Sequence, residues 1–545
     1  ADPRPAADPA DGDFWRMIED GDLADTADRL AVDPEPLDRV LPGLRAWRQR
    51  RADAEAIDSW RYRAQWQPLA EPPRRAPDGD WLVITPAGRT ADDRVRGPLQ
   101  ALAALGVDVL PVELTADDVR RDALAAKLTA ALAGRTPAGV LSLLAADARP
   151  HPRHPALPGG TALTVALVQA LGDLRIIAPL WCATNGAVST GPTDPVTDPG
   201  QALVWGTGMV AALETPARWG GLIDLPDRLD DRARARLGAA LAGAAGPGED
   251  QLALRATGLL ARRLARAPRA AGQGRPWRPR GTVLLTGGTG AVGPHLARWL
   301  ARGGAEHVVL PGRRGPDAPG ATELAAELAE SGTRLSLPRC DLTDRGAVEE
   351  MLARLDAQGD PVTAVVHAAA FIALAPLEST PLSAFERIVA AKAAGAAHLD
   401  ALLDRELDAF VLFSSIAGVW GSGDHGAYAA GNAYLGALAQ HRRARGLRAT
   451  TVDWGVWQAE NPWQGRTAGP DADLFKMAEH GLPRIDPRRA LTALQQALDD
   501  DETVLAVADV DWERFAAVFT TARPSPLLTG VPDARRVLAR QTADG

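Results

Sequence analysis

Two long stretches of the chain alternate between short apolar runs and amphipathic segments at helical spacing. In the C-terminal stretch, the apolar runs belong to the segments TVLLTGGTGAVG (282–293), HVVLPGRRG (307–315), RLSLPRCDLTD (334–344), AVVHAAA (364–370), AFVLFSS (409–415) and RATTVDWG (448–455). Helical segments lie between them at 294–303, 321–331, 346–356, 383–403 and 426–445. This alternation predicts a parallel sheet with helices on both faces. We therefore expect a complete doubly wound, Rossmann-like α/β domain here.

The N-terminal stretch repeats the alternation in a less complete form. Apolar runs at 81–85, 107–114, 138–145 and 175–184 alternate with helical segments, which predicts a second parallel sheet. Its first strand leads into Thr85-Pro86-Ala87-Gly88, where a dinucleotide site needs a run of spaced glycines. We therefore expect a degenerate Rossmann-like subdomain with a structural role and no cofactor.

Two shorter amphipathic segments precede both sheets. Residues 1–12 are rich in Pro, Ala and Asp, which predicts a linker. From residue 13 to about residue 51, apolar positions recur at helical spacing on both sides of Val32-Asp33-Pro34. The resulting helices would expose too much apolar surface to stand alone. They must pack on the next domain or on a second copy of themselves.

Composition narrows the classes of partner and site. The net charge of -9 and the pI of about 5.6 argue against nucleic acid or an anionic membrane as the main partner. No window of about twenty apolar residues exists, so we expect a cytoplasmic protein. Cys182 and Cys340 stand far apart without CxxC or His-rich neighbours, so we expect no metal site. The chain lacks an initiator Met, so we expect a piece of a longer protein.

A glycine-rich loop follows the first strand of the C-terminal stretch and opens a helix. Its glycines permit a tight turn and a close approach of backbone N–H groups to a pyrophosphate. The next strand ends in Arg313-Arg314 rather than in an acidic residue, and arginine can pair with a 2′-phosphate. We therefore expect NADPH, although a simple strand–helix turn is the alternative for an isolated glycine match. The residues expected at the cofactor are Thr286, Gly287, Gly288, Thr289, Gly290, Val292, Gly293, Gly312, Arg313, Arg314, Asp341, Leu342, His367, Ala368, Ala369 and Ala370.

A second motif combines a hydroxyl, a phenol and an amide. Ser415 ends an apolar strand thirteen positions before Tyr428, and Asn432 follows one helical turn later. A phenol is a poor proton donor unless its pKa is lowered, and a nearby ammonium does this by favouring phenolate. The chain has three lysines, and none follows a tyrosine by four residues, where a short-chain dehydrogenase normally carries one. The lysine must come from elsewhere in the sequence.

Together these motifs resemble the ketoreductase domain of a modular type I polyketide synthase, an extended relative of the short-chain dehydrogenases. The residues that carry the resemblance are TGGTGAVG, CDLTDR, VVHAAA, AAKAAGAAHLD and FSSIAGVWGSGDHGAYAAGNAYL. The resemblance implies that Tyr428 donates a proton to the ketone oxygen and that Ser415 hydrogen-bonds the same oxygen. It also implies that Lys392 lowers the pKa of Tyr428 and holds the nicotinamide ribose, while Asn432 completes the proton relay. In these ketoreductases the Lys and Asn positions are exchanged, which accounts for the missing lysine.

The resemblance extends to the rest of the chain and suggests its organisation. WRYRAQWQPL and PARWGGLIDLP are similar to the family's structural subdomain, and FWRMIEDGDL is similar to its dimerisation element. We expect a linker at 1–12, a helical dimerisation element at 13–58, a structural subdomain at 59–275, a catalytic subdomain at 276–525 and a tail at 526–545. The implied partners are an acyl carrier protein that bears the substrate, neighbouring synthase domains and a second copy of the chain.

Short markers in this family are associated with the stereochemistry of reduction. Ile372-Ala373-Leu374 stands where B-type domains carry Leu-Asp-Asp, and Trp420 stands at the position of the A-type tryptophan. His425 resembles the marker of the A2 subtype, although a surface loop histidine is the alternative reading. The segment 456–485 predicts a lid with an apolar face. The apolar residues expected on that face are Leu474, Phe475 and Met477.

The function that follows is NADPH-dependent reduction of a β-ketoacyl thioester, expected to carry a 2-methyl group, to the L-β-hydroxyacyl product. Two alternatives belong to other classes. One is a different enzyme on the same fold, such as a nucleotide-sugar epimerase, and the exchanged Lys392 and Asn432 argue against it. The other is a scaffold that does not reduce or only epimerises, and the intact Ser415, Tyr428 and glycine loop argue against it.

Overall fold

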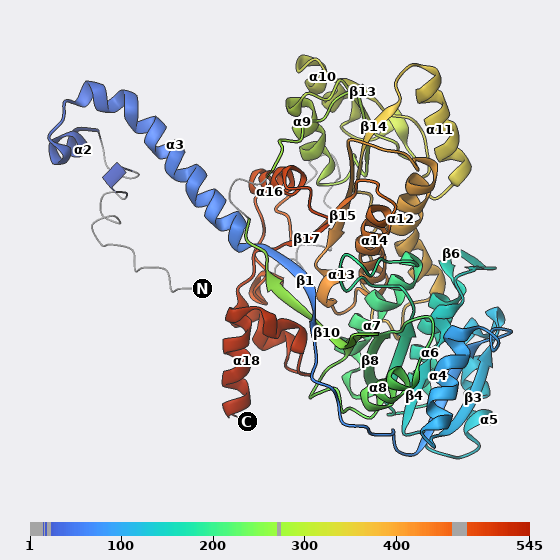
Figure 1. Cartoon of the computed structure of the whole chain (residues 1–545). Coiled ribbons are helices and arrows are strands. Elements are labelled where there is room, and N and C mark those ends of the chain that lie inside the picture. Colours follow the sequence, from blue (N-terminus) through green and yellow to red (C-terminus); the bar gives the residue numbers. More distant parts are fainter. Residues whose placement is uncertain (1–14, 16, 19–22, 270–273, 460–476, 545) are drawn as a thin grey trace. The chain divides into compact units, whose positions relative to one another are not determined.

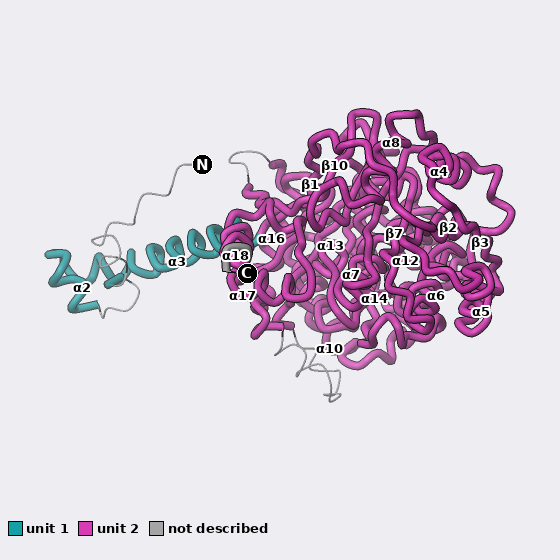
Figure 2. Tube along the Cα trace, turned by 90° about the horizontal axis from the view of Figure 1, so that it is seen from below, with its two compact units in different colours: residues 1–60 teal, residues 61–545 magenta. Residues whose placement is uncertain are grey.

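The computed structural model describes residues 15, 17–18, 23–269, 274–459 and 477–544. The chain divides into two compact units, residues 1–60 and residues 61–545 (Figure 2). The boundary after Trp60 lies close to the end of the helical element expected at residue 58. All the domain limits expected from the sequence, including this one, stay predictions.

The first unit is helical where the structure describes it. Helix α2 spans Leu23–Leu30 and helix α3 spans Pro34–Ser59. Pro34 begins α3, where a missing N–H costs no hydrogen bond. Ile18, Ala27, Leu37 and Leu41 form a small buried core between these segments. Helix α3 is longer than the sequence pattern indicated, because its polar C-terminal part has no apolar periodicity to reveal it.

The second unit is built on one sheet of fifteen strands in the order β13-β12-β11-β14-β15-β16-β17-β1-β10-β9-β8-β7-β4-β2-β3. The strands of its N-terminal half are β1 Arg61–Pro68, β2 Asp80–Pro86, β3 Asp108–Leu114, β4 Gly139–Ser142, β7 Leu180–Thr184, β8 Trp219–Asp224, β9 Gln251–Arg255 and β10 Gly258–Arg266. Those of its C-terminal half are β11 Thr282–Thr286, β12 His307–Val309, β13 Arg334–Ser336, β14 Val362–His367, β15 Ala409–Ser415, β16 Thr450–Trp454 and β17 Val504–Val507. A separate hairpin pairs β5 Pro150–His151 with β6 His154–Pro158.

Helices connect the parallel strands in both halves (Figure 1). In the N-terminal half they are α4 Asp93–Ala104, α5 Arg121–Leu132, α6 Gly159–Asp173, α7 Ala202–Glu214 and α8 Asp231–Leu241. In the C-terminal half they are α9 Gly293–Gly303, α10 Ala321–Glu330, α11 Arg345–Ala357, α12 Leu382–Leu402, α13 Ala417–Trp420, α14 Gly426–Ala444, α16 Pro487–Asp499, α17 Trp512–Phe519 and α18 Pro532–Asp544. The predicted class, α/β with doubly wound parallel sheets behind a helical element, is confirmed.

The structure adds a connection between the two halves that the sequence did not reveal. Strand β1 pairs antiparallel with β10 on one side and with β17 on the other. The two parallel sheets therefore join edge to edge into one continuous sheet (Figure 1). Strand β17 is a seventh parallel strand beyond the six predicted. The strand order of the C-terminal half reverses between β11 and β14, and open α/β sheets bind ligands at such a point.

The halves also meet through two helices. Helix α7 of the N-terminal half packs on α14 of the C-terminal half, and Gly206 lies at the crossing. A Cβ atom on Gly206 would lie 2.4 Å from the carbonyl oxygen of Ala429. Because Ala429 follows Tyr428 in α14, the half without a glycine loop supports the helix that presents the phenol.

Candidate active site

The glycine loop lies between β11 and α9, and several of its positions have no room for a side chain. Gly287 has φ 71°, and a Cβ atom there would lie 2.5 Å from the carbonyl oxygen of Ala368. A Cβ atom on Gly293 would lie 2.1 Å from the carbonyl oxygen of Gly288. The N–H of Gly290 donates to the carbonyl oxygen of Gly287 across 2.9 Å, which closes the turn. The loop is therefore tight because its glycines let backbone segments approach one another.

Behind this loop, Thr286 and His367 form a buried brace. His367 Nε2 lies 2.9 Å from the carbonyl oxygen of Lys392, and Nδ1 lies 2.9 Å from Thr286 Oγ1. Burial, and then the charge of Lys392, lowers the pKa of His367 to about 4, so the ring is neutral near pH 7. Nε2 must then carry the proton, since a carbonyl only accepts, and Nδ1 accepts from the Thr286 hydroxyl. Thr286 Oγ1 in turn accepts from the N–H groups of Ala368 and Ala369 at 3.2 and 3.3 Å.

One large cavity, of about 2340 Å³, collects most of the residues predicted from the sequence. Of these it is lined by Gly287, Thr289, Gly290, Val292, Gly312, Arg313, Arg314, Asp341, Leu342, Ala368, Ala369, Ala370, Ile372, Ala373, Leu374, Lys392, Ser415, Trp420, His425, Tyr428 and Met477. Five of the predicted residues do not belong to the lining and support it from behind. They are Thr286, Gly288, Gly293, His367 and Asn432. Leu474 and Phe475 fall outside the described residues.

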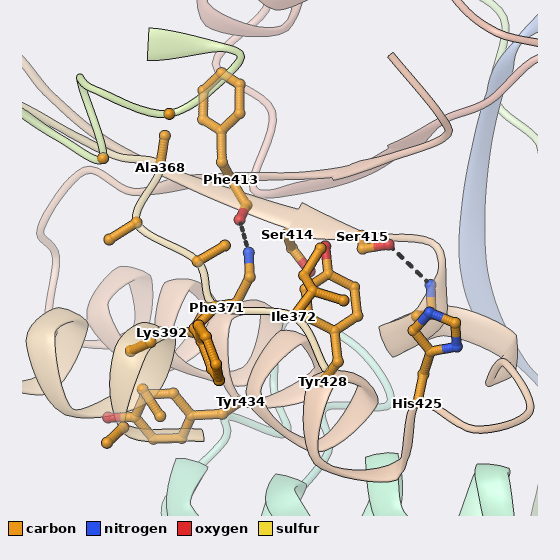
Figure 3. A pocket seen from close by; sticks show the side chains of 18 of the residues that line it. Ala368, Phe371, Ile372, Lys392, Phe413, Ser414, Ser415, His425, Tyr428 and Tyr434 are labelled. Carbon is orange, nitrogen blue, oxygen red and sulfur yellow. Dashed lines mark hydrogen bonds between the residues drawn. The ribbon is translucent and has the colours of Figure 1, made fainter. Parts of the chain in front are cut away.

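Tyr428, Lys392 and Ser415 meet in this cavity from three different elements (Figure 3). Tyr428 lies in the first turn of α14, and Lys392 Nζ lies 5.4 Å from the centroid of its ring. Ser415 ends β15, and its side chain lowers the pKa of the Tyr428 phenol. Asn432, one turn further along α14, donates from Nδ2 to the carbonyl oxygen of Tyr428 across 2.8 Å. Its Oδ1 is buried without a hydrogen-bond partner.

The electrostatics of Tyr428 differ from the expectation that an ammonium lowers its pKa. Burial raises the pKa of Tyr428, and the nearby polar side chains of Ser415 and Asn432 only partly oppose that shift. The Lys392 ammonium donates instead to the carbonyl oxygen of Phe413 across 2.6 Å. The phenol is therefore protonated at neutral pH, because desolvation outweighs the favourable contacts of the phenolate.

Burial also governs Lys392 and a carboxylate that the sequence analysis did not select. Burial lowers the pKa of Lys392 to about 7, and the negative charge of Asp453 opposes that shift. Burial likewise raises the pKa of Asp453 to about 7, against the effects of the Ser414 hydroxyl, Arg262 and Lys392. Asp453 belongs to β16 and pairs in register with Ser414 of β15. A lone acidic residue near the carboxyl end of a buried parallel strand was the signal that could have identified it.

The wall opposite Lys392 carries the predicted stereochemical markers. His425 Nδ1 lies 2.6 Å from the carbonyl oxygen of Gly423, and the centroid of the His425 ring lies 6.0 Å from that of Tyr428. Trp420 is buried against Trp512 and Phe515. Ile372, by contrast, is 53% exposed at the cavity mouth. The histidine thus lies beside the phenol rather than on a distant surface loop.

In the described part of the chain, no group of three or more His, Cys, Asp or Glu side chains is arranged to hold a metal ion. No helix within the described ranges is long and apolar enough to cross a membrane.

Comparison with known proteins identifies three regions of the chain. The model of the KR domain family matches residues 281–459, and that of the Rossmann fold domain of polyketide synthase extender module SpnB matches residues 64–264. The model of the polyketide synthase dimerisation element domain matches residues 11–53. The matches follow the order in which the sequence analysis placed a helical element, a structural half and a reductase half.

Individual relatives agree with the family matches. The polyketide synthase GfsA of Streptomyces halstedii is 49% identical over 556 residues, which cover 99% of this chain and 7% of GfsA. The pikromycin polyketide synthase component PikAIII of Streptomyces venezuelae is 49% identical over 497 residues, which cover 91% of this chain and 30% of PikAIII. This chain thus spans only a small part of the curated synthases it matches.

A solved structure matches along its whole length. An A1-type ketoreductase is 44% identical and superposes with a TM-score of 0.83, over 89% of this chain and 100% of that chain. The glycine loop, the phenol, hydroxyl and ammonium in one cavity, and these matches lead to one assignment. The chain belongs to the family of ketoreductase domains of modular type I polyketide synthases, with an N-terminal dimerisation element.

Proposed function

We propose that this protein reduces a β-ketoacyl thioester, carried by an acyl carrier protein, to a β-hydroxyacyl thioester with NADPH. The observation that carries the proposal is the single cavity shared by the glycine loop and by Tyr428, Ser415 and Lys392. The phenol and the hydroxyl both belong to the lining of this cavity, where a ketone oxygen would bind. The carrier protein and the neighbouring synthase domains follow from the family and from the small share of each relative that the chain covers.

The residues around the glycine loop fit a nicotinamide dinucleotide. Side chains are excluded at Gly287 by the Ala368 carbonyl, so backbone N–H groups are available to a pyrophosphate. Arg313 and Arg314 follow β12 with exposed guanidinium groups in the cavity lining. They would pair with the 2′-phosphate of NADPH. When bound, this cofactor supplies a hydride to the ketone carbon.

The protein's own residues manage the negative charge that develops on the ketone oxygen. Tyr428 donates its phenolic proton to that oxygen, and its raised pKa keeps the proton in place until the oxygen becomes basic. Ser415 donates a hydrogen bond to the same oxygen, as an oxyanion-hole donor does. Lys392 supplies positive charge beside the Tyr428 ring, and Asn432 holds the backbone at Tyr428.

The stereochemistry is part of the proposal. Ile372, Trp420 and His425 line the cavity around the phenol, and the B-type aspartates are absent. Similarity to A-type ketoreductases supports an L-configured β-hydroxyl. The position of His425 beside Tyr428 supports the A2 pattern, in which an α-methyl is accepted in the epimerised configuration.

Turnover of a racemic 2-methyl-3-ketoacyl thioester with NADPH tests the reaction, and chiral chromatography of the product tests its stereochemistry. Tyr428→Phe should lower kcat by about 10²- to 10⁴-fold, because the proton donor is lost. Tyr434→Phe is the matched control, since Tyr434 also lies on α14 and in the cavity lining. Equal activity of the two variants would remove Tyr428 from its role. A D-configured hydroxyl would refute the A-type assignment, and an unepimerised methyl would refute only the reading of His425.

A further inference from the structure

The carboxylate of Glu214 binds two loops of the C-terminal half. It is the last residue of α7, in the half that lacks a glycine loop. One carboxylate oxygen, Oε2, accepts from the N–H of Leu377 across 2.6 Å. The other, Oε1, accepts from the N–H of Asp424 across 2.8 Å. Each oxygen of one carboxylate thus holds a different loop.

Both loops carry residues of the cavity wall. We call residues 368–381, between β14 and α12, the Ile372 loop, and residues 421–425, between α13 and α14, the His425 loop. The first contributes Ile372 and Leu374 to the cavity, and the second contributes His425. The loops also touch one another, because the N–H of Ala375 donates to the carbonyl oxygen of Asp424 across 3.0 Å. The distance between these walls sets the width of the space beside Tyr428.

The backbone of the His425 loop is held from outside the loop. Asp424 has φ 61°, a left-handed conformation that is uncommon outside glycine and that Asp adopts more readily than most residues. Such a conformation persists when the surroundings hold it, and Glu214 binds the N–H of this same residue. Gly421 at the start of the loop lies against α7, since a Cβ atom there would be 2.9 Å from the Met209 carbonyl oxygen.

The N-terminal half holds the Ile372 loop at other points as well. Gln169 of α6 donates from Nε2 to the carbonyl oxygens of Leu377 and Thr380 at 2.9 and 2.8 Å. Arg218 pairs with Glu378 of the same loop. These contacts hold the base of one loop only. Glu214 differs from them because it binds both loops with one rigid group.

We propose that Glu214 is a positioning residue that sets the separation of the Ile372 and His425 loops and thereby the diastereoselectivity of reduction. The inference rests on the proposed function, because it concerns how the substrate's α-substituent is sorted beside Tyr428. Glu214 does not line the cavity and acts only through the two loops. The half without a cofactor loop would therefore take part in specificity.

The chemistry of a carboxylate makes the proposal testable. Both Glu214 oxygens accept from N–H groups, so an amide, with one acceptor and one donor, can replace only one of the two bonds. Glu214→Gln should therefore release one loop while it keeps the size of the side chain. Glu214→Asp keeps both acceptors and the charge but is shorter by one methylene, so it tests reach separately. Glu249→Gln is the matched control, because Glu249 also binds two N–H groups, those of Arg263, and does not line the cavity.

The decisive experiment measures the product diastereomer ratio, KM and kcat with a racemic 2-methyl-3-ketoacyl thioester, together with amide hydrogen exchange. Glu214→Gln should lower the diastereomer ratio and raise KM, each by about 10-fold. Its kcat should change by less than about threefold, because Tyr428 and Ser415 are untouched. Hydrogen exchange should accelerate at residues 371–377 and 422–425 in this variant, whereas Glu249→Gln should leave exchange at these residues, the diastereomer ratio and KM as in the wild type.

The outcomes separate this inference from the proposed function. A wild-type protein that does not reduce the substrate would defeat the proposed function, whereas hydrogen exchange would still report on the loops. A wild-type protein that reduces selectively, with Glu214→Gln equally selective and equally protected, would overturn the role of Glu214. If Glu214→Gln fails to fold, the same comparison is made with Glu214→Asp, for which wild-type selectivity and wild-type exchange would likewise overturn it.

Discussion

Burial decides the protonation of the groups closest to the candidate catalytic residues. Lys392 and Asp453 both have a pKa of about 7, one lowered and the other raised by loss of water. Lys392 therefore loses its proton at a lower pH than an exposed lysine does. Its charge depends on the carboxylate of Asp453, which does not itself line the cavity.

A pH profile tests this dependence. Asp453→Asn removes the negative charge that raises the pKa of Lys392, so the ammonium should be lost at a lower pH than in the wild type. Because the proposed reaction needs that ammonium, the alkaline fall in kcat/KM should move to lower pH. Asp250→Asn is the control, since burial raises the pKa of Asp250 to about 6 in the other half, away from Lys392. Identical alkaline limbs in the two variants would contradict this coupling.

Two arginines at the end of one strand test the choice of cofactor. Arg313→Ala combined with Arg314→Ala should raise the Kd for NADPH by at least about 10- to 100-fold, since the loss of even one hydrogen bond to a charged group costs about 1.5–3 kcal/mol. The Kd for NADH, which lacks the 2′-phosphate, should stay unchanged. Arg302→Ala is a control, because Arg302 is exposed in the same half and does not line the cavity. Fluorescence titration measures the affinity of each protein for both cofactors, and an unchanged NADPH preference in the double variant would exclude these arginines.

The packing of α7 on α14 is the closest contact between helices of the two halves. Gly206→Ala would bring a methyl group to 2.4 Å from the Ala429 carbonyl oxygen, and backbone cannot yield as a flexible side chain does. We expect the free energy of unfolding to fall by about 1–3 kcal/mol. We also expect kcat to fall by about 10- to 100-fold, because Tyr428 is displaced with α14.

A glycine of the partner helix α14 supplies the control for this prediction. Gly436 has no heavy atom within 4 Å of the position of a Cβ atom. Gly436→Ala should therefore leave kcat unchanged and stabilise the protein by about 0.5–1 kcal/mol through helix propensity. Thermal unfolding and steady-state kinetics of both variants decide the matter. Equal behaviour of the two would show that the helix contact does not position Tyr428.

Features that are encoded in one continuous segment could be predicted from the sequence, whereas contacts between distant segments could not. The six strands of the C-terminal half and the glycine loop were predictable, because apolar periodicity and spaced glycines are written in continuous segments. That Lys392 lies close to Tyr428 and Ser415 was predictable only through a family resemblance, since Lys392 belongs to a separate helix. The roles of Asp453 and Glu214 were not predictable, because each depends on contacts between segments far apart in the chain. The raised pKa of Tyr428 was missed for a related reason, since burial cannot be read from spacing.

The continuous sheet changes how the second unit is understood. The predicted boundary between structural and catalytic subdomains, at residues 275 and 276, separates two halves that share strand pairing through β1, β10 and β17. Three kinds of contact cross that boundary: the main-chain hydrogen bonds of these strands, the packing of α7 on α14, and the hydrogen bonds that Glu214 accepts from Leu377 and Asp424. The half without a cofactor loop therefore forms one compact unit with the half that carries Tyr428, which agrees with the division of the chain after Trp60 rather than within the sheet.

The helical element before the sheet carries an apolar stripe that suits self-association. Val40, Leu44 and Trp47 recur at the spacing of one face of α3, and Val40 and Trp47 are 52% and 43% exposed. Residues 11–53 match the dimerisation element of polyketide synthases. A symmetric pair would cover the same stripe on both copies. We therefore expect the chain to form a homodimer through residues 13–58.

Deletion of residues 1–58 tests the dimer and leaves strand β1 intact, since it begins at Arg61. Light scattering should give the mass of two chains for the full protein and of one chain after the deletion. NADPH-dependent reduction should continue at the same kcat, because every residue proposed to act on the substrate lies after residue 60. Val40→Asp should weaken the dimer in the full chain, whereas Asp38→Asn, at an exposed neighbouring position, should not. A monomeric full chain, or a dimer that survives the deletion, would place the association elsewhere and leave the apolar stripe of α3 to another partner.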